Sequence, residues 1–561
     1  MEMKNSTRFL FVIISLFLTI LPQQALAQPS SVIQVGQSIF SLTTFKADGT
    51  ILASTHGFFI GNNGEAISSW TPFVGAASAV IVDADGKKMD VDVMIGANEL
   101  YDICKFRVKG KSHPVTFAKN PSKSGNKVWV VGYSVKKPKC KEFPISKVEQ
   151  FMEKYNYYIF EGKAMENTEG CPFANSNGEV IGIMQMSKSG TEMHATDAAF
   201  ANTFIINALT INERVLQQTG IRVALPEKEE DALLTLMMAA NKNDSLAYER
   251  YIDDFIEAFP TSVEGYYSRA KNLLDKNDFD GADNYMQMAI DKATKKDEAH
   301  SDFATVIYLK ELYKAKVPYE KWNLQKALDE VEKAYAVNPI SAYQHQKAQI
   351  IYAMGDYQKA YDIFMQLTQS DLRNGELFYE AAQCKSQLKG EKSEIMELLD
   401  SAISVSLSTG RNNAAPYYLA RGRQFDEMGE YKKAVADYNQ YDTLMFGRAN
   451  DEFYYIKYKC ETKIRQYQQA LNDIAHAIVI NRREPLYYAE MASLQLRVNK
   501  LEDAIATCDM CLQVDPNYAD PYIIKGIALG ELKRKEEAKE AFLKAKELGD
   551  ERADGLLEKY K

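Results

Sequence analysis

The sequence predicts a multidomain chain in which an all-β region is followed by an all-α array of helical repeats. Two observations support this division. Between residues 38 and 108, short apolar runs alternate with turn sequences, a spacing typical of a β-sandwich or β-barrel. Beyond Pro226 this alternation stops, and amphipathic segments with the length and period of helices follow one another. At 561 residues the chain is too long for one hydrophobic core, so two or three domains are expected.

The composition is that of a globular protein. Hydrophobic residues make up 46% and charged residues 25% of the chain, which excludes an intrinsically disordered protein. The formal net charge is −9, and this acidic balance disfavours nucleic acid as a partner. Seven scattered cysteines do not form the disulfide framework typical of small secreted domains. The sequence gives no reason to expect a cofactor or a bound metal ion.

The first 27 residues have the pattern of a signal peptide. Lys4 and Arg8 precede an apolar run at residues 9–21, and Ala25-Leu26-Ala27 matches a cleavage site. The run holds 13 residues, fewer than the roughly 20 that cross a bilayer as a helix. We therefore expect export, to the periplasm or out of the cell, a mature chain beginning at Gln28, and no stable membrane span after cleavage.

Residues 161–183 contain a turn-rich loop, a hairpin sequence and a short apolar strand. This layout resembles the segment that carries the nucleophile in trypsin-like serine proteases, particularly the bacterial periplasmic stress-protease branch. Residues 57–76, followed by Asp102-Ile103-Cys104, are similar to the first barrel of the same family. The resemblance covers about residues 35–210 and implies an all-β trypsin-like double barrel in a domain spanning residues 28–220.

The resemblance also assigns the catalytic positions. It places Thr71 where the family has histidine, Asp102 at the aspartate and Glu169 at the serine. Acyl transfer of this type needs a base for the nucleophile's proton and a carboxylate that orients the base, and here only Asp102 is of the required type. We therefore predict a pseudoprotease. The alternative is an active endopeptidase with an unconventional site at Cys171 or Glu169, whereas packing in the core is the competing interpretation of Cys171.

Two further expectations concern the surroundings of this site. The Glu169 carboxylate either folds back onto the backbone N–H groups of Asn167 and Glu169 or points to solvent. No histidine has an evident role as a base, because we expect His56 to open a strand, His113 to lie in a loop and His194 to line a pocket wall.

The region after residue 220 contains an internal repeat. We expect a helix over residues 200–218 to close the second barrel, and Pro226 to mark the break that follows. A small residue then recurs, with Ile395 in a long gap and final steps of 36, 34 and 34 residues. Its members are Ala282, Ala327, Ala360, Ala434, Ala470, Ala504 and Ala538. This period resembles tetratricopeptide repeats and implies about eight helical hairpins over residues 221–561, with irregular boundaries near residues 370–415.

The repeats imply a function in binding. Of 33 tyrosines, 28 follow residue 220, and those not needed between hairpins could line a groove for a protein or peptide. Cys508 and Cys511 form a C-x-x-C pair on a predicted helix, where core packing competes with redox or metal chemistry. The sequence thus predicts an exported scaffold or peptide-binding protein with an inactive trypsin-like domain. Its alternatives are the active endopeptidase and a purely structural assembly factor.

Overall fold

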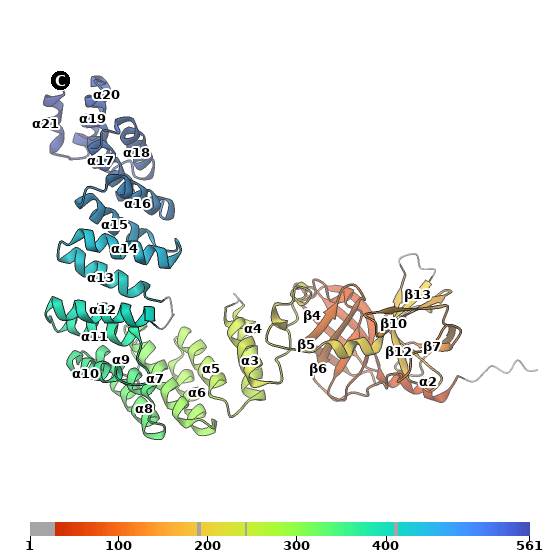
Figure 1. Cartoon of the computed structure of the whole chain (residues 1–561). Helices are drawn as coiled ribbons and strands as arrows, with labels where there is room; N and C mark the ends of the chain where they lie inside the picture. The colour runs from red at the N-terminus through yellow and green to blue at the C-terminus, as the bar shows by residue number, and fades with distance from the viewer. Residues whose placement is uncertain (1–27, 188–191, 242–243, 409–412, 561) are drawn as a thin grey trace, which may run out of the picture. The chain divides into compact units, whose positions relative to one another are not determined.

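The computed structural model describes residues 28–187, 192–241, 244–408 and 413–560. The predicted signal peptide, residues 1–27, lies outside the described residues. The chain forms two compact units, one ending at Thr294 and the other beginning at Lys295 (Figure 1). The first unit holds the β-strands and the helices up to α6, and the second unit is helical throughout its described length.

A closed six-stranded barrel opens the first unit. Its strands pair in the order β1-β2-β3-β6-β5-β4. The alternating sequence sends one face of each strand inward, where Phe40, Phe59 and Phe106 pack ring against ring. Gly64, with φ +81°, lies so close to the Val108 carbonyl that a Cβ atom would not fit. The strands are β1 (Ile39–Phe45), β2 (Ile51–Phe59), β3 (Glu65–Ser68), β4 (Ser78–Val82), β5 (Lys88–Asn98) and β6 (Ile103–Val108).

A seven-stranded antiparallel sheet follows, in the order β8-β7-β11-β12-β13-β10-β9. Its core includes Phe160 and Phe173, whose rings stack with centroids 4.2 Å apart. The two β-sheet units and the helices after them confirm the predicted fold class. The strands are β7 (Lys127–Val131), β8 (Cys140–Pro144), β9 (Lys147–Phe151), β10 (Tyr155–Glu161), β11 (Pro172–Ala174), β12 (Val180–Met186) and β13 (Glu192–Asp197).

The prediction of a helix over residues 200–218 is wrong. That stretch forms three short 3-10 helices instead: η3 (Ala198–Thr203), η4 (Thr210–Asn212) and η5 (Leu216–Gln218). The Thr203 hydroxyl donates to the Phe200 carbonyl, the Asn207 side-chain oxygen accepts from the Leu209 N–H group, and the Asn207 N–H group donates to the Thr210 hydroxyl. Such local bonds compete with a continuous helical ladder, and hydrophobic spacing alone does not reveal them.

The segment after Gly220 packs on the first barrel. The Met94 N–H group donates to the Arg222 carbonyl, and the Ala224 N–H group donates to the Met94 carbonyl, both at 2.9 Å. Ile221 and Val223 belong to the barrel core. The first compact unit therefore continues past the boundary at residue 220 that the sequence suggests. It also contains α3 (Glu229–Ala240), α4 (Ser245–Ala258), α5 (Val263–Asp275) and α6 (Phe279–Lys292).

The second unit consists of helix pairs, in which each odd-numbered helix packs on the next even-numbered one. Counting α5/α6, the described residues hold eight such pairs from α5 to α20, with α21 after them. The helices are α7 (Lys296–Tyr313), α8 (Leu324–Val337), α9 (Ser341–Ala353), α10 (Tyr357–Leu367), α11 (Gly375–Gln387), α12 (Lys392–Ser408), α13 (Ala415–Glu427), α14 (Tyr431–Met445), α15 (Asp451–Lys463), α16 (Tyr467–Ile480), α17 (Pro485–Arg497), α18 (Leu501–Val514), α19 (Ala519–Glu531), α20 (Lys535–Glu547) and α21 (Arg552–Lys559).

The recurring small residue occupies the same place in every pair. Each of the seven alanines is the fourth residue of an even-numbered helix and has an exposed fraction of 0%. Ile395 holds this position in α12, which at 17 residues is longer than the other even-numbered helices. The irregular interval near residues 370–415 therefore contains a complete helix pair. A small side chain at this position lets the two helices of a pair approach closely.

Replacing Ala504 with phenylalanine is expected to destabilise α17 and α18 by about 1 to 3 kcal/mol, because the added ring would overpack a fully buried position. Urea unfolding followed by far-UV circular dichroism measures the change. Met510→Phe is the matched control, because Met510 lies on the same helix and is 46% exposed. An unfolding curve for Ala504→Phe that overlays the wild-type curve would show that this column of alanines does not set helix spacing.

Candidate functional site

Two of the three family-derived catalytic positions lie in direct contact. Thr71 begins the 3-10 helix η2 (Thr71–Phe73), between Trp70 and Pro72. Its backbone N–H group and its hydroxyl both donate to Oδ1 of Asp102, at 2.7 and 2.8 Å. A threonine hydroxyl does not titrate near neutral pH, so the group nearest to Asp102 cannot act as a general base.

The backbone of Asp102 is held from the second sheet. Asp102 has a left-handed φ of 44°. The Gln185 side-chain amide donates to the Tyr101 and Asp102 carbonyls at 2.6 and 3.2 Å, and the Thr196 hydroxyl donates to the Tyr101 carbonyl at 3.0 Å. Both side chains are buried. These bonds connect the barrel to the seven-stranded sheet at Asp102. They also offset the cost of a backbone conformation that is rare for aspartate.

Glu169 joins the site through its backbone. Its carbonyl accepts hydrogen bonds from the His56 N–H group and the Thr55 hydroxyl, both at 3.2 Å. The side chain is exposed, yet desolvation by neighbouring protein atoms raises the pKa of its carboxyl, and the charge of Asp102 raises it further. Among the described residues, nothing donates a hydrogen bond to this carboxylate. Of the two arrangements predicted, the fold-back onto the N–H groups of Asn167 and Glu169 is not formed, and the exposed side chain agrees with the one that points to solvent; donors at the carboxylate would have lowered its pKa.

Cys171 is fully buried between strands of the second sheet. Its N–H group donates to the Thr168 carbonyl, and its own carbonyl accepts from the Met184 N–H group. Burial raises the pKa of the thiol to about 12, so the thiol is uncharged at neutral pH. A nucleophilic cysteine needs the opposite environment, exposed and electropositive. The surroundings of Cys171 favour the packing interpretation.

His56 does not lie at the strand position that the sequence predicted. His56 lies inside β2 and does not open the strand. Its Nδ1 atom is 3.2 Å from the Glu169 carbonyl, its ring lies 5.7 Å from that of Tyr133, and desolvation lowers its pKa. His56 lies close to Glu169 because two segments far apart in the sequence pair with each other, and the sequence alone does not predict this pairing. His113 lies in a loop, and His194, on β13, stacks on Tyr157 with centroids 5.4 Å apart.

A cleft runs beside His56. It consists of two hollows with volumes of about 540 and 300 Å³. Residues 54–56 of β2 and residues 165–168 line both of them. Lys137 and Lys139 line the larger hollow, whereas Glu169 and Met186 line the smaller one. The position assigned to the nucleophile therefore lies at the wall of an open groove.

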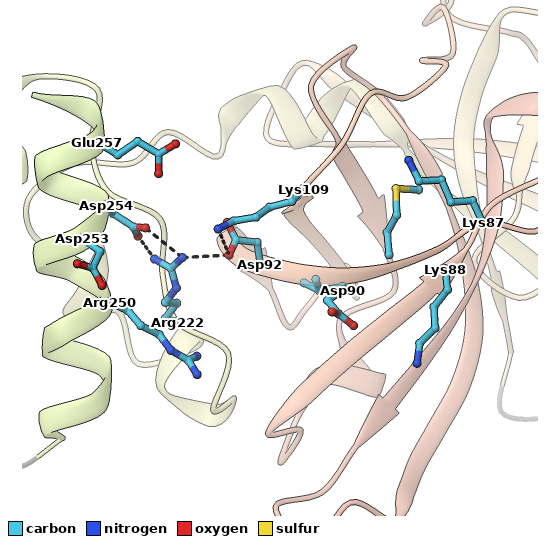
Figure 2. Close-up of a pocket in the computed structure, with 12 residues that line it drawn as sticks. Lys87, Lys88, Asp90, Asp92, Lys109, Arg222, Arg250, Asp253, Asp254 and Glu257 are labelled. Atoms are coloured by element: carbon cyan, nitrogen blue, oxygen red, sulfur yellow. Dashed lines mark hydrogen bonds and ion pairs between the residues drawn. The ribbon is translucent and has the colours of Figure 1, made fainter. Parts of the chain in front are cut away.

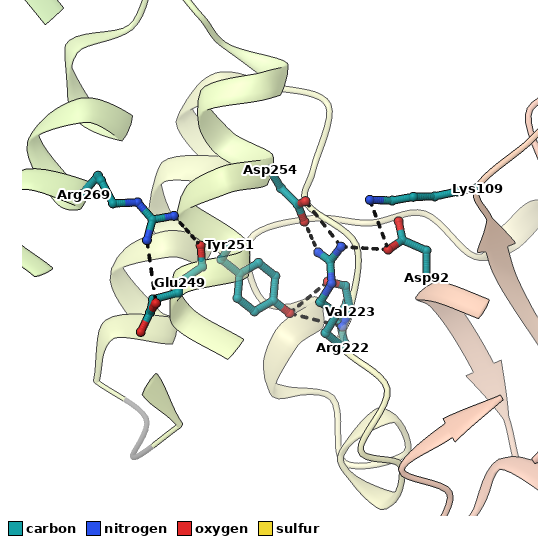
Figure 3. A network of polar contacts seen from close by, with 8 residues as sticks. All are labelled: Asp92, Lys109, Arg222, Val223, Glu249, Tyr251, Asp254 and Arg269. Carbon is teal, nitrogen blue, oxygen red and sulfur yellow. Dashed lines mark hydrogen bonds and ion pairs between the residues drawn. The ribbon is translucent and has the colours of Figure 1, made fainter. Parts of the chain in front are cut away.

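A second cavity, of about 650 Å³, lies between β5 and α4 within the first unit (Figure 2). Arg222 reaches across it and pairs with Asp92 of β5 at 3.0 Å and with Asp254 of α4 (Figure 3). Beside this bridge, the Tyr251 hydroxyl donates to the Val223 carbonyl at 2.9 Å and accepts from the Val223 N–H group at 3.2 Å. Because Arg222 and Tyr251 bond across it, we interpret this cavity as a joint between the barrel and its first helix pair.

The helical second unit contains a small hollow and a cluster of buried charged residues. A hollow of about 250 Å³ lies among α11, α12 and α13, with Tyr379 and Arg423 among its lining residues. On α15, Glu461 is 2% exposed and Lys457 is 6% exposed. The Lys457 ammonium lies 3.2 Å from Asp473 of α16 and 3.5 Å from Asp442 of α14. Buried charges of this kind are expected to fix how neighbouring helices pack.

The C-x-x-C pair lies in the repeat core. Cys508 and Cys511 are both fully buried and unbonded to each other, and the Cys511 thiol donates to the Pro485 carbonyl at 3.2 Å. Across the described ranges, no group of three or more histidine, cysteine, aspartate or glutamate side chains is arranged to hold a metal ion.

No helix in the described part of the chain is long and apolar enough to cross a membrane.

A protein-family model matches the end of the helical region. The model described as Tetratricopeptide repeat matches residues 519–548, which cover α19 and α20. The match confirms the repeat type for this last helix pair. Because such repeats generally mediate contacts between proteins, it also supports an interaction role for the helical region.

Proposed function

We propose that the protein is an exported protein-binding or scaffold protein, with a catalytically inactive trypsin-like domain and a tetratricopeptide array that holds a protein or peptide. The bonding of Thr71 to Asp102 carries the proposal. Both donors of Thr71 are directed at Oδ1 of Asp102, where a working enzyme of this family would have its base. The carboxylate that would orient a histidine is thus already bonded to a group that cannot accept the nucleophile's proton.

The neighbouring residues support the same conclusion. A carboxyl group without an activating base is a poor nucleophile toward an amide, and among the described residues no hydrogen-bond donor holds the exposed Glu169 carboxylate. The Cys171 thiol is buried and uncharged. These observations make the active endopeptidase the weaker candidate. Export to the periplasm or beyond is part of the proposal and rests on the pattern of residues 1–27.

The proposal predicts that the protein does not cleave peptides. Wild-type protein incubated with a quenched fluorescent peptide library should give turnover within twofold of buffer alone, and fluorophosphonate and thiol-alkylating probes should not label the folded chain. The reason is that no residue at the site can activate a nucleophile.

Thr71→His combined with Glu169→Ser restores the family residues and should be necessary for any turnover, so each single variant should remain at background. Glu169→Ala and Cys171→Ala test the rival function directly. Wild-type turnover that either alanine variant abolishes would establish the unconventional endopeptidase and refute our proposal.

A further inference from the structure

The cleft beside His56 consists of two neighbouring hollows. Its hollows of about 540 and 300 Å³ share two walls, residues 54–56 and residues 165–168. A ligand in one hollow would therefore continue into the other past the His56 ring. Each hollow alone has roughly the size of a small-molecule pocket. A single inorganic anion would leave most of this space empty, whereas an extended peptide would occupy both hollows.

The larger hollow is rich in positive charge. Lys137 and Lys139, in the connection between β7 and β8, line it with exposed side chains, and among the described residues neither ammonium group forms an ion pair. Glu166 is the one carboxylate in its lining. Burial lowers the pKa of His56, so this ring favours its neutral form. In a chain with a formal charge of −9, two adjacent unpaired lysines complement a ligand that carries carboxylates.

The smaller hollow has an apolar side. Ala164, Met165 and Met186 line it, and Met186 is 40% exposed. Methionine side chains are flexible and polarisable, so such a surface adapts to apolar groups of different shapes. Lys163, Glu166 and Glu169 line the same hollow, so its charges are of both signs and the carboxylates of a ligand are better placed in the larger hollow beside the lysines. An apolar side chain of the ligand would cover the methionines, which would otherwise remain in contact with water.

We propose that this groove binds an extended acidic segment of a partner protein. The carboxylates of the segment pair with Lys137 and Lys139, and an apolar side chain packs against Met165 and Met186. An anionic membrane surface fits less well, because lipid headgroups would not fill the hollow beside the methionines. The inference deepens the proposed function and rests on it, since a groove that retains a segment must leave the segment uncut.

The test uses the full mature chain and labelled eight-residue peptides in fluorescence polarisation. One peptide carries two adjacent glutamates and two leucines, and two others replace the glutamates with glutamines or lysines. We expect the acidic peptide to bind wild-type protein at least tenfold more tightly than the lysine peptide. Lys137→Glu with Lys139→Glu should weaken binding of the acidic peptide at least tenfold and strengthen binding of the lysine peptide. This reversal cannot result from misfolding.

The matched control is Lys119→Glu with Lys123→Glu. It makes the same change in net charge at two exposed lysines that do not line the groove, and it should alter affinity less than twofold. Equal effects of the two double variants, no binding of the acidic peptide to wild-type protein, or binding of phosphatidylglycerol vesicles or inorganic phosphate in its place would each overturn the inference. Mass spectrometry of the peptide after incubation separates the two proposals, because cleavage would refute the inactive domain but leave the binding result standing.

Discussion

Raising the pH from 4.5 to about 8 is expected to destabilise the α15/α16 helix pair by on the order of 5 kcal/mol, and Glu461→Gln should remove most of this loss. Burial and, after it, the neighbouring Asp473 together raise the pKa of Glu461 from 4.5 to about 8, although Lys457 opposes the shift. The folded protein therefore retains a proton that the unfolded chain releases above pH 4.5. Stability falls by about 1.4 kcal/mol for each pH unit through this window and levels off above pH 8.

The groups that face Glu461 make this prediction specific. Asp473 on α16 and Lys457 on α15 interact with it, and Lys457 also pairs with Asp442 on α14. Glutamine can donate to Asp473 as the protonated acid does, and it does not ionise. Urea unfolding at pH 5, 7 and 9, followed by circular dichroism, measures the difference. Glu452→Gln is the control, since Glu452 is exposed on the same helix. Parallel pH profiles for wild-type protein and Glu461→Gln would contradict the prediction.

Arg222→Ala is expected to destabilise the joint between the barrel and α4 by about 3 kcal/mol. The Arg222 side chain is 10% exposed and lies between the carboxylates of Asp92 and Asp254 (Figure 3). Its removal leaves two partly buried negative charges facing each other, which is the costly way to break an ion pair. The value lies at the low end for such losses because Lys109, 3.8 Å from Asp92, compensates one of the charges.

Hydrogen exchange of α4, together with urea unfolding of the first unit, measures this effect. Arg250→Ala is the matched control, because Arg250 lies on α4 at the same cavity and makes no ion pair within the described residues. Exchange in α4 should accelerate more than tenfold in Arg222→Ala and less than twofold in Arg250→Ala. Equal behaviour of the two variants would mean that the bridge does not hold the joint.

The sequence predicted the features that depend on local pattern. Period-2 alternation indicated the barrel strands, and the recurring alanine indicated every even-numbered helix from α6 to α20 except α12, which has Ile395 there, because a small residue lets two helices pack closely. The failed helix at residues 200–218 shares its spacing with real helices. Only the side-chain bonds of Thr203 and Asn207 to nearby backbone groups distinguish it.

The candidate site was predicted in part. The resemblance correctly brought Thr71 and Asp102 together across 31 positions of sequence. It did not reveal that His56 contacts the Glu169 backbone, or that Arg222 and Tyr251 connect the barrel to α4. These contacts arise where separate segments meet in three dimensions, and no periodicity in the sequence encodes such meetings.

The seven cysteines are all buried and form no disulfide bond: two lie in strands, one lies directly before β11, and four lie in helices. Each is therefore a natural reporter of opening, because a thiol that is sealed in the folded chain reacts with an alkylating reagent only after its surroundings separate. The rate of Cys104 alkylation would report when the barrel interior becomes exposed, and the rate of Cys460 alkylation would report when α15 separates from its neighbours. The order in which the seven thiols become labelled would therefore give the order in which these regions unfold, and no cysteine would have to be introduced.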